Sequence, residues 1–214
     1  MTRDASTLVL VDGDVPSMVA LAHATERQEA AGSAAVIACL WIVTGDARPR
    51  QSAVRRQVGL YGGEMLEPSG MPGGASEGLL AATRLAREHG AARVIWPVHA
   101  GVPLDPESLD VERAAGIVER SLLTERLAAI DDPDGVVIET PLADLRDAQV
   151  AELAVDQAVP LQHAWWWGSR GEAAEASRER WERAWQAIGC PLPDVDTSTN
   201  AGRVDLPGRS LRRG

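Results

Sequence analysis

Two aspartates and a serine in the short stretch VDGDVPS, Val11 to Ser17, have side chains that could carry out chemistry. The apolar run LVLV precedes this stretch and a periodic apolar segment follows it, so it is predicted to be a turn from a buried strand into a helix. Such turns present backbone N–H groups to phosphate. The carboxylates of Asp12 and Asp14 instead suit a hard cation such as Mg²⁺. The same residues also make a good helix start, because Asp14 is a favourable N-cap and Pro16 suits the first turn. A phosphate loop, a magnesium site and a plain helix cap stay open as interpretations.

Thiols and imidazoles are few, and they do not form a metal-binding pattern. The two cysteines are too isolated for a disulfide framework or a zinc knuckle, and Cys39 is predicted to be a small core residue. The histidines are widely scattered and are predicted to lie at the surface or at the edge of a pocket. They are His23, His89, His99 and His163.

Three consecutive tryptophans, Trp165 to Trp167, are the most unusual feature of the second half. Trp165 is expected to be a core residue, and one interpretation of Trp166 and Trp167 is that their indole rings fill core volume too. The other is an exposed aromatic platform for a partner or an aromatic ligand. Trp181 and Trp185 lie four residues apart, on one face of a predicted helix, and this spacing favours packing.

The elements that must position these residues alternate along the chain. Short apolar or β-branched runs bounded by Gly, Pro or Asp predict strands at 7–11, 35–43, 64–67, 93–98 and 136–139. Helical patterns cover 17–30, 77–89, 109–129, 145–156 and 173–188. Strands that alternate with helices predict an α/β fold with a mostly parallel sheet and helices on both faces.

Length and charge limit the organisation further. The 214 residues have room for one α/β domain at 1–192, with a C-terminal helical part at about 160–190. Residues 193–214 are rich in turn formers and are predicted to be a disordered tail. The net charge of −10 argues against nucleic-acid binding, because phosphate contacts need clustered Lys and Arg. No segment reads as a membrane span or a signal peptide, so a cytoplasmic protein is expected.

The second half of the sequence resembles a known family. The stretch TPLADLRDAQVAELAVDQAVPLQHAWWW, Thr140 to Trp167, resembles the corresponding segment of the 7-cyano-7-deazaguanine synthases of queuosine biosynthesis. Those enzymes are PP-loop ATP pyrophosphatases. The stretch ASRERWERAWQAIG resembles the closing helix of the family, and the resemblance covers most of residues 7–192. It implies an adenine-nucleotide α-hydrolase-like (HUP/PP-loop) fold and ATP-dependent conversion of a carboxylate to an amide or nitrile.

The phosphate loop departs from the family pattern S-G-G-x-D-S. The resemblance places a degenerate loop at Asp12, Gly13, Asp14 and Ser17, of which only the glycine and the serine are retained. A carboxylate about 4 Å from a phosphate charge repels it by about 4 kcal/mol at an effective dielectric constant of about 20. ATP and Mg²⁺ are therefore weak candidates as cofactors.

Two further departures concern an arginine and the zinc ligands of the family. The P-x-R-N motif falls on Pro72 to Ala75, so that Gly73 and Gly74 are candidate ligand-contacting residues without the arginine, while a family lysine corresponds to Asp147. The first zinc ligand falls at Trp167 and the last near Ser177 or Arg178, none of which supplies a thiolate. No metal ligand is assigned, and zinc is not expected.

Two functions from different classes remain open. The favoured one is a divergent PP-loop protein that does not catalyse the family reaction and acts in small-ligand binding or assembly. The alternative is an ATP-dependent C–N ligase or amidotransferase that adenylates 7-deazaguanine or a related carboxylate without zinc. Whether the chain is an enzyme stays open. Its expected partners are a small-molecule ligand or a protein, not nucleic acid or a membrane, and a homo-oligomer is compatible with the sequence.

Overall fold

Five parallel strands form one sheet in the order β3-β2-β1-β4-β5, in a computed structural model that describes residues 6–32, 37–40, 47–66, 75–101, 109–130 and 135–192. The strands are β1 (Ser6–Val11), β2 (Ile37–Leu40), β3 (Glu64–Leu66), β4 (Ala91–Ile95) and β5 (Val137–Glu139). Strand β1 lies at the centre, with Leu8 beside Ile37 of β2 and beside Val94 of β4. All five strands overlap the predicted ones.

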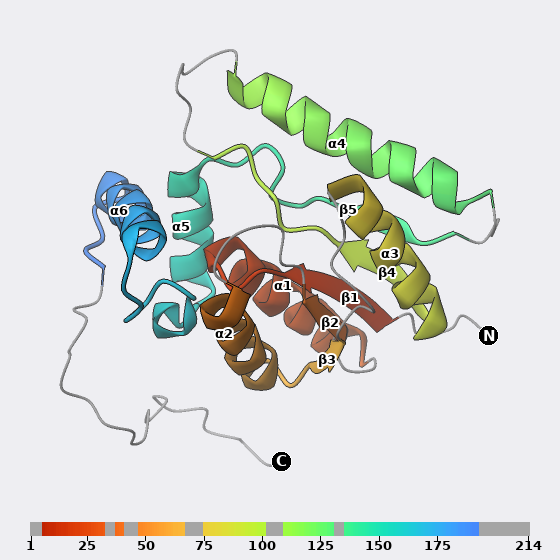
Figure 1. Ribbon diagram of the computed structural model, residues 1–214, viewed down its shortest axis with the longest axis horizontal. Helices are drawn as coiled ribbons and strands as arrows, with labels where there is room; N and C mark the ends of the chain where they lie inside the picture. Colours follow the sequence, from red (N-terminus) through yellow and green to blue (C-terminus); the bar gives the residue numbers. More distant parts are fainter. Residues whose placement is uncertain are drawn as a thin grey trace.

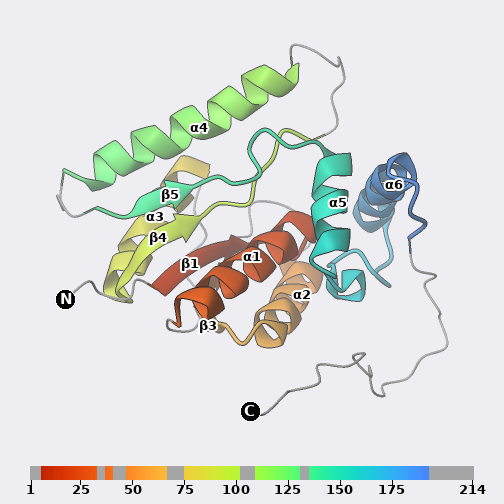
Figure 2. The same cartoon turned by 180° about the vertical axis from the view of Figure 1, so that it is seen from behind.

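Helices cover both faces of the sheet, as Figures 1 and 2 show from opposite sides. The helices are α1 (Val15–Ala31), α2 (Ala47–Leu60), α3 (Ala75–Glu88), α4 (Leu109–Ala128), α5 (Asp147–Asp156), the 3₁₀ turn η1 (Leu161–His163) and α6 (Glu172–Ala187). Side chains of α1 and α2 pack on Val9, Val11 and Ile95 on one face. On the other face, side chains of α3 and α4 pack on Leu8, Leu10 and neighbouring strand residues.

A third core joins the C-terminal helices to the start of α1. In it, Val15 and Met18 pack in one buried cluster with Val150 of α5, Trp166 and Trp181. Figures 1 and 2 both show α5 and α6 gathered at the end of the molecule that contains the N-terminus of α1. This packing brings α6, from late in the chain, beside the turn that follows β1.

Some element ends differ from the prediction for local reasons. Helix α1 begins two residues early because Asp14 caps it, and it ends at Gly32, where φ is 63°. Strand β4 ends at Ile95 rather than at residue 98, because Pro97 has no N–H to continue the ladder. Helix α2 was not predicted at all. Of the predicted strand at 35–43 only residues 37–40 are described, and the predicted tail at 193–214 lies outside the described residues.

No helix in the described ranges combines the length and the apolar character that a membrane crossing requires.

Candidate functional site

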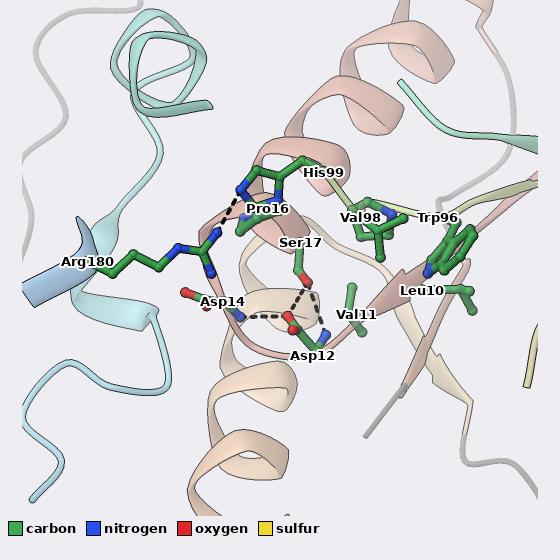
Figure 3. A pocket seen from close by; sticks show the side chains of 11 residues that line it. Leu10, Val11, Asp12, Asp14, Pro16, Ser17, Trp96, Val98, His99 and Arg180 are labelled. Atoms are coloured by element: carbon green, nitrogen blue, oxygen red, sulfur yellow. Dashed lines mark hydrogen bonds between the residues drawn. The ribbon is translucent and has the colours of Figure 1, made fainter. Parts of the chain in front are cut away.

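A cavity of about 260 Å³ lies at the carboxyl ends of β1 and β4. The strand order reverses direction between these two strands, and open α/β sheets bind ligands at such a switch point. Its walls come from the end of β1, the first turn of α1, the segment Trp96 to His99 and Arg180 of α6. Figure 3 shows Arg180 reaching toward His99, with Asp12, Asp14 and Ser17 beside them.

The predicted loop residues Asp12, Gly13, Asp14 and Ser17 do lie together at this site, and they bond mostly to one another. Asp12 Oδ1 accepts the Ser17 hydroxyl at 2.7 Å and the Asp14 N–H at 2.9 Å. The Asp12 N–H donates to Ser17 Oγ at 3.0 Å, and the Val15 N–H donates to Asp14 Oδ1 at 2.9 Å. Side chains of the loop thus accept hydrogen bonds from three of its backbone N–H groups, and Pro16 has no backbone N–H.

Gly13 sits where only glycine fits. Its φ is 87°, and a Cβ there would lie 3.1 Å from the backbone oxygen of Arg50 and 3.4 Å from Trp165 Cβ. The Gly13 carbonyl accepts the Trp165 N–H at 2.8 Å and the Gln57 side-chain amide at 2.9 Å. The loop is therefore tied to α2 and to the tryptophan segment.

Asp14 is the anchor of the loop. Its Oδ1 accepts the Trp166 indole N–H at 2.8 Å and the Trp181 indole N–H at 2.9 Å, in addition to the Val15 N–H. Burial raises the pKa of Asp14, and the charge of Asp12 adds to this, against the hydrogen bonds from Val15 and Trp166. We expected both carboxylates to face the space of a triphosphate. Both do line the cavity, but Oδ1 of Asp14 is taken up by the indoles.

The tryptophans pack in the core, as one of the two interpretations predicted. Trp166 is fully buried, so the exposed-platform interpretation is wrong for it, while Trp165 at 4% exposure and the fully buried Trp181 pack in the core as expected. Trp181 and Trp185 meet edge to face with ring centroids 5.9 Å apart, which confirms the packing expected from their spacing. Trp167 is partly buried against the same cluster.

A second polar network, which the sequence did not reveal, closes the other side of the cavity. Arg180 donates through Nε to Asp147 Oδ2 at 2.7 Å and through Nη2 to Oδ1 at 2.6 Å. His99 Nε2 lies 2.8 Å from Asp147 Oδ1 and 3.0 Å from Arg180 Nη2. Burial alone would raise the pKa of Asp147, but hydrogen bonds and positive charge from Arg180 and His99 outweigh it and lower the pKa to about 2.

Positive charge also reaches the loop from α2. Arg50 Nη1 lies 3.2 Å from the Asp12 carbonyl and 3.4 Å from its Oδ2, and its guanidinium stacks over the Trp165 ring. The sequence predicted only that the Pro72 to Ala75 segment supplies no arginine, and the contact from Arg50 of α2 was not foreseen. A guanidinium beside Asp12 supplies the charge that a magnesium ion would bring, and so weakens the case for a cation there.

The other two predicted sites are the glycine pair of the P-x-R-N segment and the places of the family's zinc ligands. Gly73 and Gly74 lie outside the described residues. The places of the family zinc ligands, Trp167, Ser177 and Arg178, carry no thiol, and the described residues contain no group of three or more His, Cys, Asp or Glu side chains that could hold a metal ion. The prediction about zinc still awaits a test.

Comparison with known proteins gives likeness of structure alone. No protein-family model and no curated protein sequence matches the chain. Among solved structures it is similar to the U34-tRNA thiolase NcsA from Methanococcus maripaludis with its 4Fe-4S cluster, at 11% identity and a TM-score of 0.48, over 95% of this chain and 80% of that one. It is also similar to NAD+ synthetase from Burkholderia pseudomallei, at 14% identity and a TM-score of 0.39, over 88% of this chain and 83% of that one.

The α/β fold class is confirmed by the sheet and its helix layers: the chain has a parallel sheet covered by helices on both faces.

Proposed function

We propose that this chain is a divergent PP-loop protein, similar to the 7-cyano-7-deazaguanine synthases, that does not catalyse their ATP-dependent reaction and instead binds a small ligand in the switch-point cavity. The observation that carries the proposal is the closed loop at Asp12 to Ser17. A pyrophosphate cradle needs free backbone N–H groups at the start of the helix. Here the carboxylates of Asp12 and Asp14 accept hydrogen bonds from the N–H groups of Asp14 and Val15 at the helix start, and the Ser17 hydroxyl accepts one from the N–H of Asp12 in the preceding turn.

Opening this loop for a triphosphate would cost free energy beyond the replacement of carboxylate acceptors by phosphate oxygens. Asp14 would have to release two indole N–H groups that are buried away from water, and each such unsatisfied donor costs about 1–3 kcal/mol. A phosphate that entered without displacing the carboxylates would meet like charge. Both routes disfavour ATP at this position.

The cavity itself suits a smaller molecule. Its volume of about 260 Å³ is the space of about eight or nine waters at about 30 Å³ each. It offers an apolar wall from Leu10, Val11 and Trp96, and polar groups from Ser17 and Arg180. Mostly apolar walls with a few convergent polar groups are typical of small-molecule sites.

One observation favours the alternative function, an ATP-dependent ligase. Arg50 and Arg180 approach the loop from two helices, and guanidinium groups stabilise charge in phosphoryl and adenylyl transfer. In that case the loop would rearrange on binding ATP, and Arg50 would leave Asp12 for the phosphates.

A pyrophosphate-release assay separates the two functions. Purified protein is incubated with ATP, Mg²⁺, ammonia and a carboxylated 7-deazaguanine, and an active synthase serves as the positive control. We expect no release of AMP or pyrophosphate above the rate without protein. Turnover of about 1 per second or faster, in the range of an ordinary enzyme, together with its loss in Arg50→Gln, would establish the ligase and overturn the proposal.

A further inference from the structure

Four arginines surround two hollows that adjoin the switch-point cavity. One hollow, of about 400 Å³, is lined by Arg113 and Arg120 of α4, and the other, of about 570 Å³, by Arg113 of α4 and by Arg180 and Arg183 of α6. His99 and Ala100 line both. We call this region, formed by Arg113, Arg120, Arg180 and Arg183, the arginine basin. Such a concentration of positive charge is unexpected in a chain with a net charge of −10.

Helices α4 and α6 bring the side chains of Arg113 and Arg180 together near Gly101. Arg113 and Arg120 lie seven residues apart on α4, and Arg180 and Arg183 lie three apart on α6, so each pair shares one face of its helix. Gly101 lies between the two helices: a Cβ on it would be 3.4 Å from Arg180 Nη2 and 3.8 Å from Arg113 Nη1. Two guanidinium groups from different helices therefore flank the same point.

Little negative charge balances them. Asp147 contributes one carboxylate, and Arg180 holds both of its oxygens. Arg113 donates to the Ala100 carbonyl at 3.1 Å, which is uncharged. No carboxylate is among the described residues that line either hollow, although Asp14 and Asp12 also attract the charge of Arg180 from the side of the loop. Among the described residues that line the two hollows, positive charge therefore exceeds negative charge, an arrangement that concentrates anions.

We propose that the arginine basin binds the phosphate group of a phosphorylated small molecule, whose uncharged part lies in the switch-point cavity. A doubly charged oxyanion with several acceptor oxygens suits several convergent guanidinium groups, which pair with phosphate through charge and N–H donors. His99 and Arg180 line both the cavity and the basin, so the two spaces adjoin, and the proposal requires a ligand to pass these two side chains. This proposal deepens the proposed function, because it names the class of ligand for the same cleft and places its phosphate away from the Asp12 to Ser17 loop.

Calorimetric titration at constant ionic strength tests this with three probes: inorganic phosphate, ribose 5-phosphate and ribose. We expect both phosphates to bind and ribose not to bind. The variants Arg113→Gln and Arg183→Gln should each weaken phosphate binding by about 10-fold, the loss of about one charge-assisted contact. Arg126→Gln, an exposed arginine elsewhere on α4, is the matched control and should change affinity by less than about 2-fold. Arg180 is left unchanged, because its loss would leave Asp147 buried without a partner.

Three results would overturn the proposal: equal affinity for ribose and ribose 5-phosphate, tighter binding of a dicarboxylate such as succinate than of phosphate, or the same affinity in Arg113→Gln, Arg183→Gln and Arg126→Gln. Circular dichroism of each variant confirms the fold. None of these probes contains a triphosphate, so the outcome is independent of the pyrophosphate-release assay. If phosphate does not bind, the further inference fails but the absence of ATP turnover still stands. If ATP is turned over, the proposed function fails, whether or not phosphate binds at the basin.

Discussion

Replacement of Asp14 separates its role as a buried hydrogen-bond acceptor from its charge. In Asp14→Ala, the indole N–H groups of Trp166 and Trp181 and the N–H of Val15 lose their common acceptor. Both tryptophans are fully buried, and no other hydrogen-bond acceptor for their indole N–H groups is found among the described residues. Each buried unsatisfied donor costs about 1–3 kcal/mol, and the lost helix cap about 1 kcal/mol. We expect Asp14→Ala to lower the free energy of unfolding by about 3–6 kcal/mol.

Asp14→Asn should behave differently. The amide oxygen remains an acceptor in nearly the same place, while the buried charge is removed. The pKa of Asp14 is raised by burial and by Asp12, which means that the ionised form is disfavoured in the folded protein. The stability tied to this group is complete below the unfolded pKa of 3.8 and decreases as the pH rises through the folded pKa. At neutral pH, Asp14→Asn should therefore stay within about 1 kcal/mol of the wild type.

Urea denaturation followed by tryptophan fluorescence measures both variants. A loss of about 3–6 kcal/mol corresponds to a fall in melting temperature of about 6–24 °C for a chain of this length. Asp156→Ala, an exposed aspartate at the end of α5, is the control and should lie within about 0.5 kcal/mol of the wild type. The reasoning is refuted if Asp14→Ala is as stable as Asp14→Asn, since the indoles would then not depend on this carboxylate.

Four further predictions concern other groups. The folded pKa of Asp147 is lowered to about 2 from 3.8, so its stabilisation of about 2 kcal/mol is present above about pH 4 and is lost as the pH falls toward about 2. In urea denaturation, Asp147→Asn should therefore lose less stability between these pH values than the wild type. Identical dependence of stability on pH in the two proteins would contradict this prediction. The single tyrosine, Tyr61, should titrate at about pH 12 in the folded protein, because burial and the charge of Glu26 raise its pKa from 10.0. Its contribution to stability is complete below the unfolded pKa and lost as the pH rises through the folded one, and an ultraviolet titration with its midpoint at the unfolded value would disprove this. Elemental analysis of untagged protein should find no stoichiometric zinc, and one zinc per chain would contradict the assignment. Truncation after Pro193 should leave the melting temperature nearly unchanged, whereas a fall of several degrees would show that the tail packs on the rest of the protein.

The strand pattern was readable from the sequence because parallel strands are buried on both faces and appear as short apolar runs. Helix α2 was missed for the opposite reason. Its sequence ARPRQSAVRRQVGL holds four arginines and two glutamines, and the buried side chains described in it are Ala53, Val54 and Val58 with the polar Gln57, so few apolar residues mark it as a helix that faces the core. Gln57 is buried because its side-chain amide bonds to the carbonyls of Gly13 and His163, far away in sequence. No local pattern carries that information.

In the candidate site, too, the contacts between residues close in sequence were predictable and those between distant residues were not. The turn at Asp12 to Ser17 was predictable, since its hydrogen bonds join residues at most five positions apart. The indole contacts to Asp14 span 152 and 167 positions, and the Arg180 to Asp147 pair spans 33. These contacts depend on how α5 and α6 pack against α1. Arg50 was missed because it belongs to the unpredicted helix α2.

The affinity for ATP, measured by calorimetry with and without Mg²⁺ on the wild type and on Asp14→Asn, tests most directly whether the loop is closed to phosphate. A closed loop predicts no binding tighter than about 1 mM for the wild type, no dependence on Mg²⁺, and tighter binding by Asp14→Asn, which removes one like charge. Micromolar, Mg²⁺-dependent binding by the wild type that weakens in Asp14→Asn would contradict this. It would mean that the aspartates hold a magnesium ion and that the turn after β1 is a working nucleotide site.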